Sequence, residues 1–124
     1  MKDLLLVFAG GGLGSIARFL VGKAYKNWQP GFPMATLTAN FLSCVVLGAL
    51  VMLGVNKMNL SYSLKLLLIT GFCGGFSTYS TFTLETVELF KSGQHLLGLV
   101  NFILNFLLSV SGLYLGFLAV KALG

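Results

Sequence analysis

The stretch GFCGGFSTYSTFTLE, residues 71–85, decides the fold of this chain. It interrupts an apolar run, and seven of the ten residues at 77–86 carry a hydroxyl group. The glycine pair Gly74–Gly75 lies directly before the hydroxyl-rich part. Glycine pairs favour helix kinks, and serine or threonine caps the start of a new helix. The stretch therefore predicts a helix that breaks at this point, with Ser77 or Thr78 capping a second half-helix.

The composition indicates an integral membrane protein. Of the 124 residues, 56% are hydrophobic and 9% are charged, and the mean hydropathy is +0.92. An average soluble domain has about 25% charged residues. The eight basic residues are scattered singly between apolar runs, which excludes a nucleic-acid interface and is typical of lysines at membrane boundaries. The first apolar run continues to Tyr25, so we interpret it as a retained helix and not as a signal peptide.

Hydropathy predicts an all-α fold of four transmembrane helices in one domain, residues 1–124. The helices are expected at residues 4–25, 33–53, 60–90 and 96–120. Short connections make neighbouring helices antiparallel. As one helix the third segment, of about 30 residues, would be roughly 45 Å long, whereas the hydrocarbon core is about 30 Å thick. Its break near residues 74–78 therefore falls inside the membrane.

A helix break inside the membrane releases backbone N–H and C=O groups from pairing. These groups cannot face lipid, so they must be buried in protein or line an ion-binding cavity. The alternative is a glycine kink that serves only helix packing. The hydroxyl groups beside the glycines favour the cavity.

Uncharged polar residues form stripes at helical spacing on three of the predicted helices. Such side chains are costly in lipid and should face the protein interior, where they either bond helices together or line a pathway. The members are Thr36, Asn40, Ser43 and Cys44 in the second segment, Ser80, Thr81 and Thr83 in the third, and Asn101, Asn105 and Ser109 in the fourth. For Asn101 taken alone, hydrogen bonding between helices is the preferred interpretation.

The chemistry of these stripes favours an anion. A cation pathway usually contains an acid within the membrane, and here only Glu85 and Glu88 lie near the end of a span. Hydroxyl groups, amides and helix N-termini suit an anion. Tyr79 and Phe82, three residues apart on the half-helix after the break, add electropositive ring edges.

Arg18 is the one arginine within a predicted span. Gly10, Gly14 and Arg18 recur every four residues, so the charge shares a helix face with small residues that pack against protein. Arg18 either pairs structurally or draws anions into a vestibule, and the sequence leaves both roles open.

Charge does not decide how the chain is oriented in the membrane. One side would carry Lys2, Lys57, Lys65 and Lys121, and the other would carry Lys23, Lys26 and Lys91, together with Arg18 if an arginine within the span is counted, which gives four charges against three or four. Such a balance gives no preference under the positive-inside rule. Four short helices are also too few to enclose a pore. Both observations favour an antiparallel, dual-topology homodimer.

The sequence resembles the Fluc (CrcB) fluoride channels over essentially its whole length. The resemblance lies in GGGLGSIARFLVG (residues 10–22), TLTANFLSCVVLG (36–48), GFCGGFSTYSTFTLE (71–85) and NFLLSVSGLYLG (105–116). It implies an antiparallel homodimer in the cell (inner or plasma) membrane, with two fluoride pathways. Each pathway would export cytoplasmic fluoride passively down its electrochemical gradient and so lower fluoride toxicity.

The resemblance also implies site residues. The fluoride pathway would comprise Thr36, Asn40, Tyr79, Ser80, Thr81, Phe82, Asn105 and Ser109, and Arg18 matches the first-span arginine of the family. The backbone carbonyls of Gly74 and Ser77 would hold a structural sodium ion at the dimer centre. Tyr79 stands where phenylalanine is usual, and its hydroxyl either holds fluoride more tightly or shifts the path. Ser77 stands where threonine is common, which should matter little for a backbone ligand.

Two other function classes stay open at this point. Small proton-coupled multidrug or guanidinium transporters share the four-span, dual-topology form, but they rely on a first-span glutamate. The first span here has no acid beyond Asp3. A membrane subunit without transport activity would use the polar stripes only for assembly. An enzyme is not expected, because the single histidine, His95, has no acid or cysteine nearby to act with it.

Overall fold

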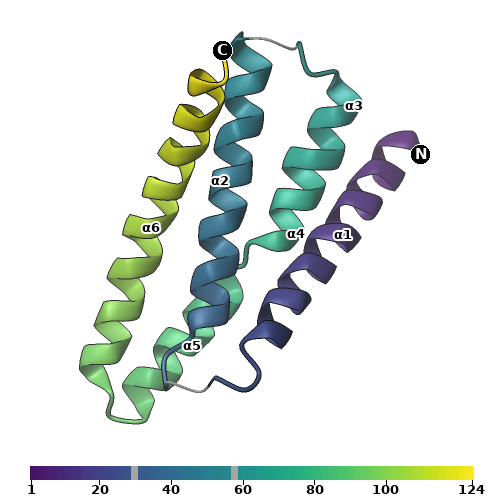
Figure 1. Cartoon of the computed structure of the whole chain (residues 1–124). Coiled ribbons are helices and arrows are strands. Elements are labelled where there is room, and N and C mark those ends of the chain that lie inside the picture. The colour runs from purple at the N-terminus through teal and green to yellow at the C-terminus, as the bar shows by residue number, and fades with distance from the viewer. Residues whose placement is uncertain (29–30, 57–58) are drawn as a thin grey trace.

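Three long apolar helices frame the molecule (Figure 1). The computed structural model describes residues 1–28, 31–56 and 59–124, and the three helices are α1 (Lys2–Ala24), α2 (Met34–Asn56) and α6 (His95–Ala122). Within these described ranges, α1, α2 and α6 are the helices long and apolar enough to cross a membrane. They cover the first, second and fourth predicted segments, and the described part of the chain contains no strand.

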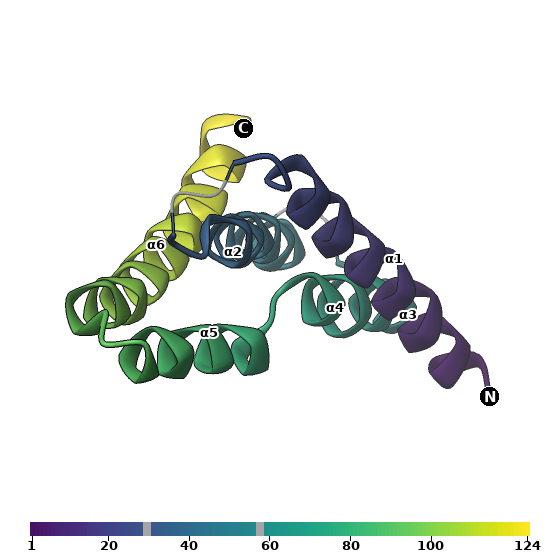
Figure 2. The same cartoon turned by 90° about the horizontal axis from the view of Figure 1, so that it is seen from below.

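The third predicted segment folds as two half-helices. The first half is continuous through α3 (Tyr62–Leu64), the π-helical η1 (Lys65–Cys73) and α4 (Gly74–Phe76), and the second half is α5 (Tyr79–Lys91). Ser77 and Thr78 between them are extended, with ψ angles of 158° and 114°. The break therefore lies where the sequence predicts it, and Figure 2 shows α5 displaced sideways from α4.

The glycine pair does not make the break, contrary to the prediction. Gly74 has helical backbone angles, with φ −63° and ψ −37°. Gly75 serves packing, because a methyl group there would overlap the Gly11 carbonyl of α1. The helix stops after the pair because Thr78 N–H donates to Asn40 Oδ1 at 2.8 Å and not to the Gly74 carbonyl one turn back. A tertiary hydrogen bond to α2 thus ends the first half-helix.

Seen end-on, the helices form two arms that meet at α2 (Figure 2). α6 and α5 make one arm, while α1 and the half-helix from α3 to α4 make the other. α2 packs along α6, where Gly48 and Gly116 let the two backbones touch. Contact through small residues is typical of helix pairs in membranes.

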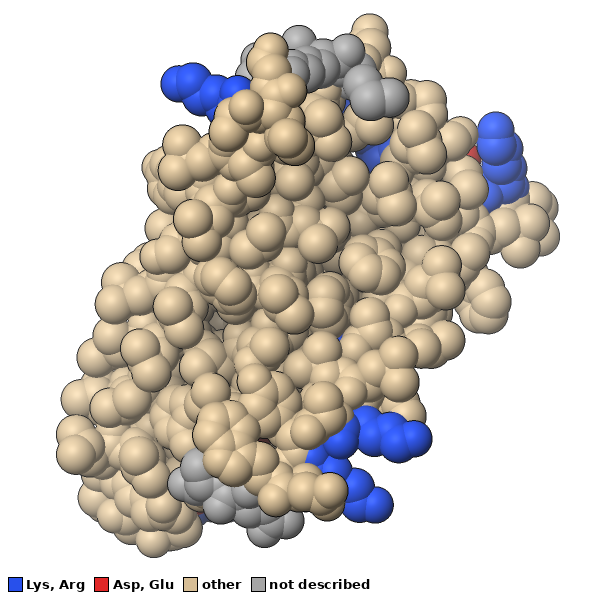
Figure 3. All heavy atoms as spheres, in the orientation of Figure 1, with Lys and Arg blue, Asp and Glu red and all other residues tan. Residues whose placement is uncertain are grey.

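Positive side chains gather at the two ends of the molecule. Figure 3 shows basic side chains toward both ends of the visible face and an almost uncharged surface between them. Lys2, Lys65 and Lys121 lie toward the end that holds both termini, and Lys23, Lys26 and Lys91 lie toward the other end. Lys57 lies outside the described residues. The charges of the described lysines are therefore balanced across the fold.

The small residues of α1 pack against protein, as predicted. Gly10 and Gly14 are buried, and their backbones touch η1 and α4. A methyl group on Gly14 would overlap the Phe72 carbonyl, whereas Gly12 is exposed and has no neighbouring atom where a methyl group would lie. The contact between α1 and α4 therefore depends on missing Cβ atoms.

We expect Gly14→Ala to destabilise the fold and Gly12→Ala to leave it unchanged or more stable. The methyl group at position 14 meets backbone atoms of Phe72 and Phe76, and overpacking of this kind costs about 1–3 kcal/mol. At position 12 it meets no neighbour, and alanine favours the helix by up to about 1 kcal/mol. Thermal unfolding midpoints of the two purified variants in detergent measure the difference. Equal midpoints would contradict this packing.

Candidate functional site

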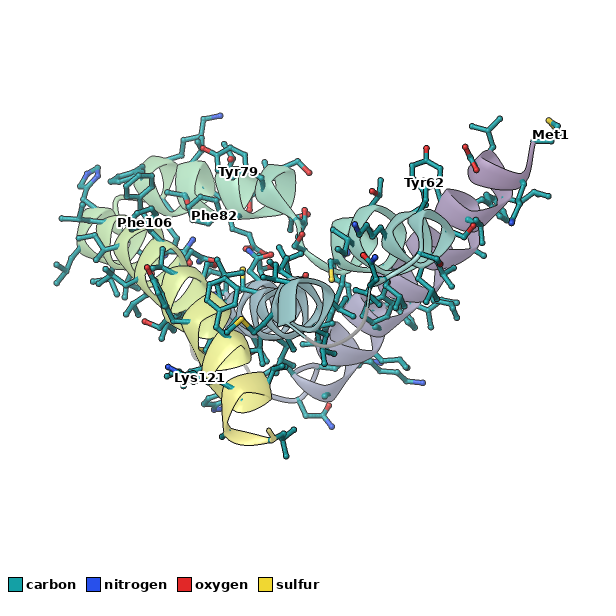
Figure 4. All side chains as sticks on the ribbon, turned by 90° about the horizontal axis from the view of Figure 1, so that it is seen from above. Met1, Tyr62, Tyr79, Phe82, Phe106 and Lys121 are labelled. Carbon is teal, nitrogen blue, oxygen red and sulfur yellow. The ribbon has the colours of Figure 1, made fainter. Side chains whose placement is uncertain are left out.

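A cavity of about 300 Å³ lies beside the start of α5. Its walls come from α2, α5 and α6, and Figure 4 labels three of its residues, Tyr79 and Phe82 on α5 and Phe106 on α6. The lining residues are Asn40, Tyr79, Phe82, Phe102, Asn105, Phe106 and Ser109. Five of them, Asn40, Tyr79, Phe82, Asn105 and Ser109, are predicted pathway residues, so the fold brings these together in one place.

Aromatic rings form one wall of the cavity. The ring centroids of Tyr79 and Phe82 are 5.6 Å apart with an interplanar angle of 57°, and those of Phe82 and Phe102 are 6.1 Å apart at 28°. Phe82 is 7% exposed, whereas Tyr79 is 77% exposed. Tilted rings offer electropositive edges to a neighbouring anion. The wall therefore suits an anion that has lost part of its water.

Three asparagine amides connect the helix break to α2 and α6. Asn40 Oδ1 accepts from Thr78 N–H at 2.8 Å, and Asn40 Nδ2 donates to Asn105 Oδ1 at 3.1 Å. Asn105 Nδ2 donates to Asn101 Oδ1 at 2.9 Å. Asn101 Nδ2 donates to Thr86 Oγ1 at 2.9 Å. This series of hydrogen bonds therefore begins at Thr78, crosses α2 and α6, and ends on α5. All three amides are buried, so these bonds are shielded from competing water.

The half-helix α5 presents unpaired backbone N–H groups at its start. Thr78 is the N-cap, as the sequence predicts for Ser77 or Thr78, and its Oγ1 accepts from Thr81 N–H at 3.2 Å. The N–H groups of Tyr79 and Ser80 occupy the first two helical positions, which have no acceptor within a helix. Together with the helix dipole, they make this end of α5 electropositive.

Thr36 and Glu85 form a separate polar contact one turn before Asn40. Thr36 Oγ1 donates to Glu85 Oε1 at 2.7 Å, and Glu85 Oε2 is buried without a hydrogen-bond partner among the described residues. Glu85 and Glu88 line a second, more open hollow of about 450 Å³ beside the segment that follows α1. Thr36 is not among the residues that line the cavity beside α5.

The remaining predicted side chains lie at the margins of the site. Ser80 and Thr81 are exposed on α5, with their hydroxyl oxygens 3.4 Å and 3.0 Å from Thr78 Oγ1. Ser109 is half-buried in the cavity wall. Arg18 is half-buried on α1 and forms no ion pair or hydrogen bond with any residue that the structure describes. Pairing with an acid is therefore not seen within this part of the chain.

The two carbonyls expected to hold sodium have lost their helical partners. In a continuous helix, Gly74 O would accept from Thr78 N–H, and Ser77 O would accept from Thr81 N–H. Those two N–H groups donate to Asn40 Oδ1 and Thr78 Oγ1. Gly74 is exposed and has open space where a side chain would lie. Carbonyls at a broken membrane helix are suitable ligands for a sodium ion, so these residues fit the group.

The sequence as a whole matches a known family model. The model is described as CrcB-like protein, Camphor Resistance (CrcB), and it matches residues 5–117. The chain belongs to the CrcB family. Its apolar helices and this membership make it a multi-pass membrane protein.

Relatives of this CrcB chain are similar over nearly its full length. A Rhizobium etli protein named fluoride-specific ion channel FluC is 40% identical over 124 residues, which cover 99% of both chains. Proteins with the same name from Pyrococcus abyssi and Phocaeicola vulgatus are each 37% identical. These matches cover 98% of both chains for the first, and 94% of this chain and 96% of the relative for the second.

Three residues that line or adjoin the site of this CrcB protein were not predicted as site residues from the sequence. Phe102 and Phe106 line the cavity, and they follow Asn101 and Asn105 by one residue at the same four-residue spacing. That four-residue spacing could have indicated that Phe102 and Phe106 share a helix face beside the asparagines. Glu85 bonds a threonine that lies 49 positions away in sequence, and no sequence pattern indicates this contact.

Proposed function

We propose that this CrcB chain forms a fluoride-selective passive channel, which exports cytoplasmic fluoride down its electrochemical gradient and so lowers fluoride toxicity. The observation that carries the proposal is the cavity lined by two asparagine amides and by aromatic rings, beside the N-terminal end of α5. No acid lines this cavity among the described residues. The names of the three relatives support the same ion.

The groups at this site suit a small, strongly hydrated anion. A selective pathway must replace the water of fluoride with donors and yet release the ion. Asn40 Nδ2, the N–H groups of Tyr79 and Ser80, and the Phe82 ring edge offer several weak sites of this kind. Thr36, Thr81, Asn105 and Ser109 complete the proposed pathway, and Arg18 is assigned to its vestibule. Permeation changes no covalent bond, so no residue is assigned a catalytic role.

The structure offers little support for the alternative function, a small proton-coupled transporter. Transporters of that kind rely on an acid in the first span, and here that acid would have to be Asp3, which lies exposed in the first turn of α1, 3.4 Å from the Tyr62 hydroxyl. A proton-coupled carrier needs an acid at the substrate site within the membrane. Membership of the CrcB family also does not support this alternative.

Liposomes that contain only the purified protein test the channel directly. With valinomycin present, we expect rapid fluoride efflux and little chloride efflux. Phe82→Ile removes the buried ring of the wall, and we expect fluoride efflux to fall about tenfold or more, which corresponds to roughly 1.4 kcal/mol in the permeation barrier. Asn40→Asp places a carboxylate in the pathway and should abolish efflux.

Phe19→Ile is the matched control, because Phe19 is 68% exposed on α1. It should conduct like the unsubstituted protein. No fluoride efflux from well-folded protein would rule out the channel, and proton-coupled cation transport would then be the next assay.

We further propose that the chain works as an antiparallel, dual-topology homodimer in the inner or plasma membrane. The hydroxyl groups of Ser80, Thr81 and Tyr79 are on exposed residues of α5, and lipid cannot satisfy them. The freed carbonyls of Gly74 and Ser77 also need polar partners. A second copy packed over the break would supply polar partners to the hydroxyl groups and to the carbonyls, and the balanced lysines permit either orientation in the membrane.

Cysteine labelling tests the antiparallel arrangement. Asn27 and Asn59 are exposed at opposite ends of the fold, and each is replaced by cysteine in a background without the native Cys44 and Cys73. In intact cells, a membrane-impermeant maleimide should label about half of the protein at each position. Complete labelling at one position with none at the other would establish a single orientation.

We also propose that one structural sodium ion lies at the dimer centre, held by the backbone carbonyls of Gly74 and Ser77. The diverted N–H groups of Thr78 and Thr81 support this, because they leave those carbonyls without helical donors. A bound cation would offset the negative ends of the carbonyl dipoles where the two copies meet. The ion is assigned a structural role and is not transported.

Sodium removal tests this assignment. Protein purified and assayed with N-methylglucamine as the only cation should lose fluoride efflux, and added sodium should restore it. Elemental analysis after gel filtration of the active protein should find one sodium ion for every two chains. Full efflux with no retained sodium would refute the assignment.

A further inference from the structure

Asn101 lies outside the cavity yet is the most deeply enclosed large side chain of the described residues, with 0% exposure. Its amide joins two elements of the site. Nδ2 donates to Thr86 Oγ1 on α5, and Oδ1 accepts from Asn105 Nδ2 on the cavity wall. The most buried amide among the described residues therefore contacts the cavity wall through Asn105.

Every hydrogen bond in this series points the same way. At one end, Thr78 N–H can only donate, and at the other end the Phe82 carbonyl can only accept, which it does from Thr86 Oγ1 at 2.7 Å. The single hydroxyl hydrogen of Thr86 is used there, so Thr86 must accept from Asn101. This turns Asn101 Oδ1 toward Asn105. Aligned hydrogen bonds of this kind polarise and strengthen one another.

Asn105 is held as an acceptor toward Asn40. Its Nδ2 donates to Asn101 Oδ1 at 2.9 Å and to the Asn101 backbone carbonyl at 3.1 Å, which uses both hydrogens. Only Asn105 Oδ1 is left for Asn40. Asn40 Nδ2 gives it one hydrogen, while the other meets the Thr78 carbonyl only at 3.4 Å, a long bond. The loosely held amide hydrogen of the series is therefore that of Asn40.

We propose that Asn101 is a positioning residue, which holds Asn105 as an acceptor and so keeps the Asn40 amide turned with its spare N–H available to an anion in the cavity. This inference rests on the proposed fluoride pathway. If Asn105 turned over, its Nδ2 would face Asn40 Nδ2, and two donors would oppose each other. Asn40 would then keep its bond from Thr78 N–H but lose the acceptor that holds its Nδ2.

Three variants separate positioning from a merely structural role. Asn101→Leu removes the side-chain acceptor of Asn105 at nearly constant size and leaves it only the Asn101 backbone carbonyl. Thr86→Val removes the acceptor that fixes the direction of the Asn101 amide, whereas Thr86→Ser keeps that hydroxyl group. We expect fluoride efflux per folded dimer to fall about tenfold in Asn101→Leu and in Thr86→Val, and to fall less than about threefold in Thr86→Ser. Equal losses in Thr86→Ser and Asn101→Leu would overturn the inference.

A second measurement does not depend on whether Asn101→Leu folds. Side-chain amide signals of the unsubstituted protein, labelled with ¹⁵N-asparagine, are followed during a fluoride titration. The Asn40 signals should shift most, and the Asn105 signals should shift clearly less. Shifts of Asn105 as large as those of Asn40 would refute the positioning role. If the unsubstituted protein shows neither efflux nor any shift, the proposed function itself is wrong, and this inference falls with it.

Discussion

The hydrogen bond from Thr78 N–H to Asn40 Oδ1 is the contact on which the rest of the site depends. It takes the N–H that a continuous helix would give to the Gly74 carbonyl, and so it ends the first half-helix. A new helix, α5, can then begin at Tyr79, with Thr78 as its N-cap. The same bond sets the direction of the Asn40 amide. One interaction between α2 and the third segment thus makes the break, frees a carbonyl and orients a pathway donor.

The two sides of the break have opposite electrostatic character. The end of α4 exposes carbonyl oxygens, whereas the start of α5 exposes N–H groups at the positive end of a helix dipole. A single interrupted helix can therefore hold a cation on one side and attract an anion on the other. The amides of Asn40 on α2 and Asn105 on α6 lie on the anion side, where no carboxylate lines the cavity among the described residues. This division is the physical basis of the proposed fluoride selectivity.

Small residues hold each arm of the molecule together. Gly75 on α4 contacts Gly11 on α1, and Gly48 on α2 contacts Leu113 on α6, so both arms rest on backbone contacts that leave little freedom. The polar series across α5, α2 and α6 needs this rigidity, because hydrogen bonds weaken as their donors and acceptors move apart. The polar site therefore depends on the apolar packing, because both need close contact between helices in lipid.

The sequence by itself determined the helices, the place of the break and most of the cavity wall. Hydrophobic length and helical spacing are local properties, so they predicted α1, α2 and α6 as well as the shared faces of Asn40, Asn105 and Phe82. Only the tertiary structure decided why the helix breaks, because the acceptor for Thr78 lies on another helix. It also decided the direction of the amide series and the pairing of Thr36 with Glu85. Hydrogen bonds between distant residues depend on how helices pack, and no local pattern records them.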